Sequence, residues 1–183
     1  MWTYRPVLEA WVDIHDLEDC PSNTLPGFTD RLVAWLPSLI EHRCSYEERG
    51  GFIKRLEEGT WPAHILEHIT LELQNLAGML GGFGKARETN KRGVYKVVVR
   101  AWHEKITEKA LYHARDLVMA AIEDRPFDVP AAIKEIEDMV QHAPQYAIVA
   151  HLKSREAAGE RQRIHKTTFV KFVSFVSPSK MRC

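Results

Sequence analysis

The chain has 183 residues, enough for one domain with a hydrophobic core, and its 45% hydrophobic and 27% charged residues are ordinary for a globular protein. Its formal net charge is zero, but residues 141–183 hold eight Lys and Arg against two Glu, a net of +6. Residues 1–140 therefore carry −6, and an acidic body with a basic tail argues against a nucleic-acid-binding domain.

Several absences bear on where the protein works. No window approaches the roughly 18–20 apolar residues of a membrane span, and the start of the chain lacks the pattern of a secretory signal. The three cysteines are odd in number, unevenly spaced and without a CxxC pair, which favours reduced thiols over a disulfide framework. Together these features predict a cytoplasmic protein without a membrane partner.

The first sixty residues predict one strand followed by helices. Residues 6–14 have the composition of a strand. A helix with apolar spacing is expected from about Thr29 until Pro37 breaks or restarts it, and a short helix over 52–58 ends at Gly59.

The strongest single element is a helix over 61–79, with Thr60 as its N-cap and Pro62 in its first turn. Its apolar positions form one stripe, and its polar positions lie on the other side of the helix. The apolar stripe comprises Ile65, Ile69, Leu73, Leu76 and Leu80, and the polar side comprises His64, Glu67, His68, Glu72 and Asn75.

The second half of the chain alternates again between strand and helix. Residues 93–102 predict a β-branched strand, 104–123 an amphipathic helix, and 129–140 a shorter helix. The fold class is therefore α+β: a single domain with a small mixed or antiparallel sheet packed with several helices, plus a basic C-terminal tail. We place the domain at 1–140 and the tail at 141–183, where a repeated Phe-Val pair predicts a late strand or an aggregation-prone segment.

The sequence HILEH within the long helix is the pattern with the most chemical content. His64 and His68, four residues apart, project from one helical face and can reach one ion, and Glu67 lies where it could take a proton from water. This is the inverted form of the zinc-peptidase motif. Glu72 is a candidate third ligand or supporting carboxylate, and His42 or Cys44 is an alternative third ligand. The other interpretation is an ordinary solvated or substrate-binding polar face.

Six blocks in order resemble one protein family. They are PSN with PGF (21–28), LPSLIEHRCS (36–45), GGF (50–52), EGTW leading into HILEHITLELQ (58–74), GFG with RET (82–89), and GVY (93–95). Over roughly residues 2–140 the chain resembles the N-terminal domain of cyanophycin synthetases.

The resemblance implies a function that composition alone does not. These enzymes build cyanophycin, a poly-aspartate chain with arginine on each side chain, using ATP-dependent domains that follow the N-terminal one. The resemblance implies that the N-terminal domain binds the polymer. It also implies a metal-dependent hydrolase in some members, with His64 and His68 at the metal and Glu67 as base, and it makes a homo-oligomer possible. With zinc as the metal expected from the motif, Glu72 stays the candidate third ligand from helix spacing.

Charged residues in or beside the matched blocks are the candidate polymer contacts, because a zwitterionic polymer needs both signs of charge. They are Arg49, Arg55, Lys85, Arg87 and Glu88. The nucleotide-binding signatures of the ligase domains are absent, so no ATP site is expected here. The family's opening strand is not matched either, which predicts an exposed sheet edge beside residues 6–14. Three functions stay open: a polymer-binding domain, a metal-dependent hydrolase that cuts the polymer into primers, and a non-functional fragment.

Overall fold

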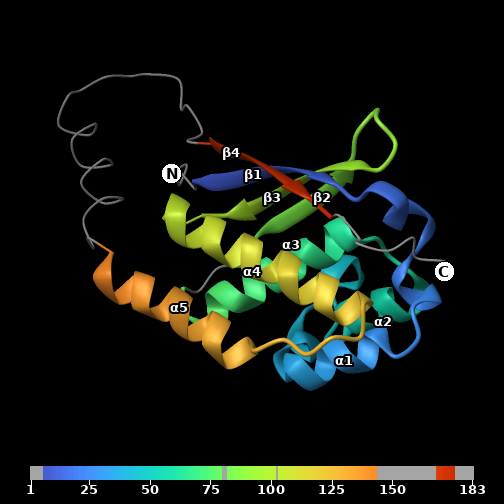
Figure 1. Cartoon of the computed structure of the whole chain (residues 1–183), viewed down its shortest axis with the longest axis horizontal. Coiled ribbons are helices and arrows are strands. Elements are labelled where there is room, and N and C mark those ends of the chain that lie inside the picture. The colour runs from blue at the N-terminus through green and yellow to red at the C-terminus, as the bar shows by residue number, and fades with distance from the viewer. Residues whose placement is uncertain (1–5, 80–81, 102, 144–167, 176–183) are drawn as a thin grey trace.

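A computed structural model of the chain describes residues 6–79, 82–101, 103–143 and 168–175. One four-stranded sheet in the order β2-β3-β1-β4 forms one layer, and the helices cover one of its faces (Figure 1). The α+β class with a mixed sheet is confirmed. Among the described residues, no helix has the length and apolar composition needed to span a bilayer.

The two inner strands alternate between buried and half-buried side chains, as strands packed on one face do. In β1 (Val7–Asp13), Leu8, Ala10 and Val12 face the helices and are fully buried. β3 (Val94–Arg100) runs antiparallel to β1, with Leu8 opposite Val99. This alternation is the pattern that made both strands predictable from sequence.

The outer strands were harder to predict. β2 (Gly84–Glu88) runs antiparallel to β3 in a charged stretch for which the sequence predicted no element. β4 (Thr168–Ser174) runs parallel to β1 and comes from the segment for which the sequence offered no partner. Beside residues 6–14 there is consequently no open edge, because β1 lies between β3 and β4. The division of the chain at residue 140 stays a prediction.

Contacts with the helical layer and with β1 hold β4 in place. Lys171 forms ion pairs with Glu104 and Glu108 of α4 (Glu104–Ile122), at 3.2 and 3.0 Å. Phe175 is fully buried and its N–H donates to the carbonyl of Asp13 at 2.9 Å. Residues of the C-terminal segment therefore contribute to the sheet and to the core.

Two helices form the centre of the helical layer. α3 (Pro62–Leu76) and α4 pack against one another, and both contact the sheet. α1 (Phe28–Trp35), α2 (Gly51–Glu58) and α5 (Val129–His142) lie around them, as Figure 1 shows. Two short 3-10 turns, His15–Asp19 and Ser22–Thr24, lie between β1 and α1, and two more, Pro37–Glu41 and Cys44–Tyr46, connect α1 to α2.

The long helix differs from its sequence-based expectation in three ways. Trp61 is the N-cap residue and Thr60 makes no cap bond, because its hydroxyl lies 2.9 Å from Nδ1 of His64. Leu76 is 39% exposed, so it does not belong to the buried stripe, and Leu80 lies outside the described residues. Glu67, His68 and Glu72 are buried, so this side of the helix is not a solvated face.

Candidate functional site

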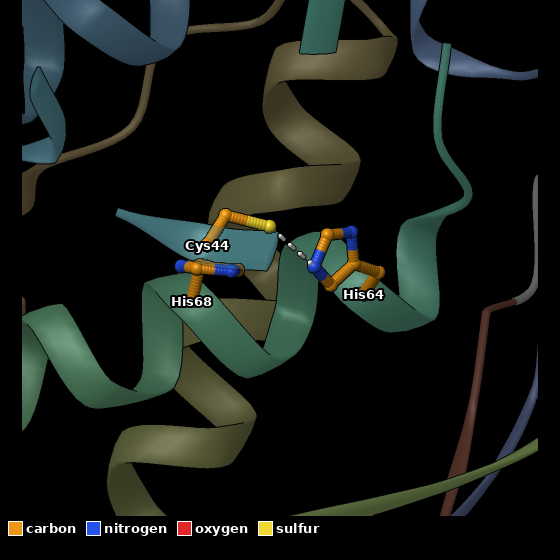
Figure 2. Close-up of side chains that lie close together, drawn as sticks. All are labelled: Cys44, His64 and His68. Carbon is orange, nitrogen blue, oxygen red and sulfur yellow. Dashed lines mark hydrogen bonds between the residues drawn. The ribbon is translucent and has the colours of Figure 1, made fainter. Parts of the chain in front are cut away.

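Two histidines and a cysteine come together at the N-terminal half of α3. His64 and His68 lie one helical turn apart, with ring centroids 4.9 Å apart, and Sγ of Cys44 lies 3.4 Å from Nε2 of His64. The three residues each offer one ligand atom within 4.8 Å of the others, and Figure 2 shows the thiol facing the two rings. Cys44, His64 and His68 could therefore hold a metal ion.

The cysteine is brought to the helix by an unusual loop. Cys44 has a φ of 53°, in the left-handed region, and begins a 3-10 turn. The loop packs onto the start of α2 so closely that a Cβ on Gly51 would lie 1.9 Å from the carbonyl oxygen of Arg43. Only glycine fits at position 51, and this close approach sets where the thiol lies. Cys44 is not part of a disulfide.

Phe52 holds the two imidazole rings. It is fully buried, stacks on His68 with a centroid distance of 4.0 Å and an interplanar angle of 18°, and meets His64 edge-on at 6.0 Å. Its N–H also donates to the carbonyl of His42 at 3.1 Å. A ring packed on two sides loses rotameric freedom, so Phe52 fixes the direction in which both histidines point.

A chain of hydrogen bonds runs from His68 into the protein. Its Nδ1 lies 2.9 Å from Nδ1 of His42, and Nε2 of His42 lies 2.7 Å from Oε2 of Glu72. The hydroxyl of Ser38 donates to the other oxygen of Glu72. Burial acts to raise the pKa of Glu72, but the hydrogen bonds from His42 and Ser38 outweigh burial and hold the pKa below its usual value.

The charge on Glu72 determines which nitrogens carry protons. A carboxylate requires a donor, so a neutral His42 carries its proton on Nε2 and accepts from His68 through Nδ1. His68 then carries its proton on Nδ1, which leaves Nε2 with a lone pair for a ligand. In this structure Glu72 contacts His42, and through His42 it orients His68. Cys44, one of the two alternatives for a third ligand, lies beside both histidines.

The acid–base state of both histidines suits metal binding. Burial lowers the pKa of His64 to about 4, with a further contribution from the charge of Arg55. Burial also lowers the pKa of His68 to about 2, with smaller contributions from His64 and His42. Neutral imidazole is the form that binds metal, and both rings are neutral around pH 7.

Glu67 lies on the same helix and faces the start of β2. It is 6% exposed, and burial raises the pKa of its carboxyl to about 7, although the Ala86 N–H and the charge of Lys85 act to lower the pKa. A Cβ on Gly84 would lie 2.5 Å from Oε1 of Glu67, so the strand can approach this carboxyl only because residue 84 is glycine.

These groups share one pocket of about 870 Å³. Cys44, His64, His68 and Glu67 all line it. Four of the five charged residues suggested as polymer contacts line it too: Arg55, Lys85, Arg87 and Glu88. The fifth, Arg49, does not line it, but pairs at 2.6 Å with Glu41, which does. The pocket thus combines cations and carboxylates near the metal-ligand group.

Some residues of the site had no signal in the sequence. Phe52 looked like an ordinary core residue of a short helix, and Ser38 like a residue of a helical turn. Thr60 was noticed only as a helix cap, but its hydroxyl can accept the proton of His64 Nδ1 and leave Nε2 for a ligand. Phe52 reaches the histidines, and Ser38 reaches Glu72, only through tertiary packing, so no spacing rule could have found these two residues.

Comparisons with known proteins agree on one family. A protein-family model described as the cyanophycin synthase-like N-terminal domain matches residues 9–123. The chain is 42% identical over 140 residues to a cyanophycin synthetase of Synechocystis sp., 75% of this chain and 16% of that protein. It is 50% identical over 105 residues to the cyanophycin synthetase of Geminocystis herdmanii, 56% of this chain and 12% of that protein. The chain therefore spans less than a fifth of the length of these relatives.

Proposed function

The chain belongs to the cyanophycin synthase-like N-terminal domain family, and from this premise we propose that its pocket binds cyanophycin and cleaves the polymer main chain with zinc. Cys44, His64 and His68 would hold the ion, and Glu67 would serve as the base. The observation that carries the proposal is that three metal-ligand atoms and a buried carboxyl line the same pocket.

The donor set suits zinc. Sulfur and nitrogen atoms bound to a tetrahedral zinc at about 2.3 and 2.0 Å lie roughly 3.5 Å from each other. The separation of 3.4 Å between Cys44 Sγ and His64 Nε2 agrees with that value. Three protein ligands from one cysteine and two histidines also match a catalytic rather than a structural zinc site, which leaves a position for water or substrate.

The chain's own residues supply the remaining parts of a hydrolysis. Zinc contributes a Lewis acid that polarises an amide carbonyl and makes water more acidic. Glu67 would accept a proton from the attacking water and return it to the leaving nitrogen, so that the amide C–N bond is replaced by a carboxylate and an amine. Gly84, whose missing Cβ leaves space for Oε1 of Glu67, would keep the carboxyl close to β2 during both transfers.

The charges around the pocket fit a zwitterionic polymer. Cyanophycin repeats a carboxylate and a guanidinium along its length, and the pocket offers Arg55, Lys85 and Arg87 beside Glu88. Single exposed ion pairs contribute about 0–1 kcal/mol, but contacts repeated along a polymer add avidity. This mixture of charge also favours a second candidate function, polymer binding without cleavage.

One experiment separates the two functions. The purified chain would be analysed for metal by mass spectrometry and incubated with cyanophycin, with and without a chelator, and the products would be identified by mass. We expect near-stoichiometric zinc and chelator-sensitive cleavage that Glu67→Gln and His64→Ala abolish. Polymer binding with no metal and no cleavage would leave only the binding function.

If Glu67→Gln cleaves at the wild-type rate, this mechanism is wrong. The control variant is Lys109→Ala, because Lys109 carries a charge but lies on α4, where it pairs with Glu135 of α5 outside the pocket. We expect Lys109→Ala to cleave normally.

A further inference from the structure

The free edge of β2 borders the same pocket. β2 is an end strand of the sheet that the described residues form, and it pairs with β3 on its other side. All five of its residues, Gly84 to Glu88, line the pocket that contains the metal-ligand group. An end strand offers a row of main-chain donors and acceptors, so this wall of the pocket can bind another extended chain.

The register of the ladder shows which groups face the pocket. The N–H of Arg100 donates to the carbonyl of Phe83, and the N–H of Thr89 donates to the carbonyl of Val94. In an antiparallel ladder such directly bonded pairs alternate with pairs whose groups point away. Lys85 and Arg87 therefore bond to β3, while the N–H and C=O groups of Gly84, Ala86 and Glu88 point to the free edge.

Glu67 lies beside this edge. The N–H of Ala86, which is one of the groups assigned to the free edge, acts to lower the pKa of its carboxyl. The absent side chain of Gly84 leaves the space that this carboxyl occupies. The carboxyl that would act on a substrate thus lies beside the edge, and the neighbouring edge groups lie within reach of the same substrate.

We propose that β2 binds the main chain of an extended peptide polymer as an added strand, and so lays the scissile amide beside Glu67. The inference rests on the proposed function and specifies how the polymer would bind to the protein. Main-chain pairing is independent of side-chain identity and repeats at every second residue, which suits a polymer of identical units. Lys85 and Arg87 then share one face of the strand, and Glu88 lies on the other. The side chains of an added strand alternate between the same two faces, so some would lie beside the cations Lys85 and Arg87 and others beside the carboxylate of Glu88.

The test uses synthetic oligomers of aspartate with arginine on each side chain. Binding to the full chain is measured by calorimetry in the Glu67→Gln background, which prevents cleavage. We expect methylation of every main-chain nitrogen of the oligomer to weaken binding about tenfold, because about two hydrogen bonds are lost. An oligomer methylated at every second nitrogen is the matched control, because in one register it keeps every donor that faces the edge.

The protein side is tested with Glu88→Pro against Glu88→Gln. Proline removes a donor that faces the pocket and leaves the bonds to β3 intact, whereas glutamine removes only the charge. We expect the proline variant to bind the unmethylated oligomer several-fold more weakly than the glutamine variant. Hydrogen exchange should show new protection at the N–H groups of Gly84 and Glu88 when the oligomer binds.

The outcomes distinguish the two proposals. If the oligomer binds and wild-type protein cleaves the polymer, but full methylation has no effect and Gly84 and Glu88 gain no protection, strand addition is wrong and the proposed function stands. If the polymer is neither bound nor cleaved, both proposals are wrong. The methylated oligomers decide the question even if Glu88→Pro does not fold.

Discussion

α3 and α4 are neighbouring helices with similar amphipathic sequences, yet the polar side of α3 is buried and that of α4 is partly exposed to solvent. On α4, Lys109 and His113 reach Glu135 of α5, whose side chain is 48% exposed. On α3, Glu67, His68 and Glu72 are 4–7% exposed. The same pattern of polar residues thus gives a solvated surface on one helix and a buried set of ionisable groups on the other.

The difference lies in what covers each polar side. α4 turns its polar side to α5 and solvent, while the loop that carries His42 and Cys44 folds over α3. Buried polar groups are tolerated only when they are hydrogen-bonded, and His42 and Ser38 supply hydrogen-bond partners for His68 and Glu72. Burying ionisable groups lowers the stability of a fold, and such groups gather at functional sites. The comparison therefore favours α3 as the functional helix.

The largest expected effect tests whether the α3 set binds metal at all. In Cys44→Ser a hydroxyl replaces the thiol that faces His64. We expect zinc affinity to fall by more than about a hundredfold, measured by competition with a chromophoric chelator. The matched change on α4 is His113→Ala, which should leave zinc affinity unchanged. Equal zinc affinity in the two variants would mean that the polar side of α3 differs from that of α4 only in burial.

The next effect tests the hydrogen-bonded chain behind His68. Glu72→Gln keeps the size of the side chain and an acceptor for His42, but removes the charge that orients both histidines. Changes of this kind lower metal affinity about 10–100-fold. We expect that loss in the same competition assay, with Glu135→Gln on α5 as the control. A normal affinity in Glu72→Gln would show that the tautomer of His68 is set by other groups.

A third prediction concerns the loop that covers α3. In Gly51→Ala the added Cβ would meet the carbonyl oxygen of Arg43 at 1.9 Å, a contact that only backbone movement can relieve. We expect the free energy of unfolding, measured by chemical denaturation, to fall by about 1–3 kcal/mol. Gly82→Ala is the control, because a Cβ there has nothing within 4 Å. A wild-type stability for Gly51→Ala would mean that the loop does not depend on this close approach.

Much of this architecture could be predicted from sequence, for reasons that particular elements make clear. β1, β3, α4 and α5 follow local periodicity, and the spacing of His64 and His68 on α3 suffices to place both near one ion. The choice between His42 and Cys44 needed the fold, because Gly51 and the left-handed backbone of Cys44 set the loop. Periodicity also could not show that the polar side of α3 is covered.

The two outer strands illustrate a second limit. Charged side chains are common on end strands, so Lys85, Arg87 and Glu88 give β2 the composition of a loop. β4 has an obvious strand composition, but its partner β1 lies at the other end of the chain. Local composition therefore predicts that a strand exists more readily than it predicts where the strand pairs.

The smallest expected effect lies on α4. Lys109 donates to Glu135 at 2.6 Å, but both side chains are substantially exposed and the pair is open to water and salt. Lys109→Ala should change the free energy of unfolding by no more than about 0.5–1 kcal/mol. We expect denaturant unfolding to show this small change and zinc affinity to be unaffected. A loss as large as that of Gly51→Ala would mean that the polar side of α4 is structurally as important as that of α3, and the contrast between the two helices would be wrong.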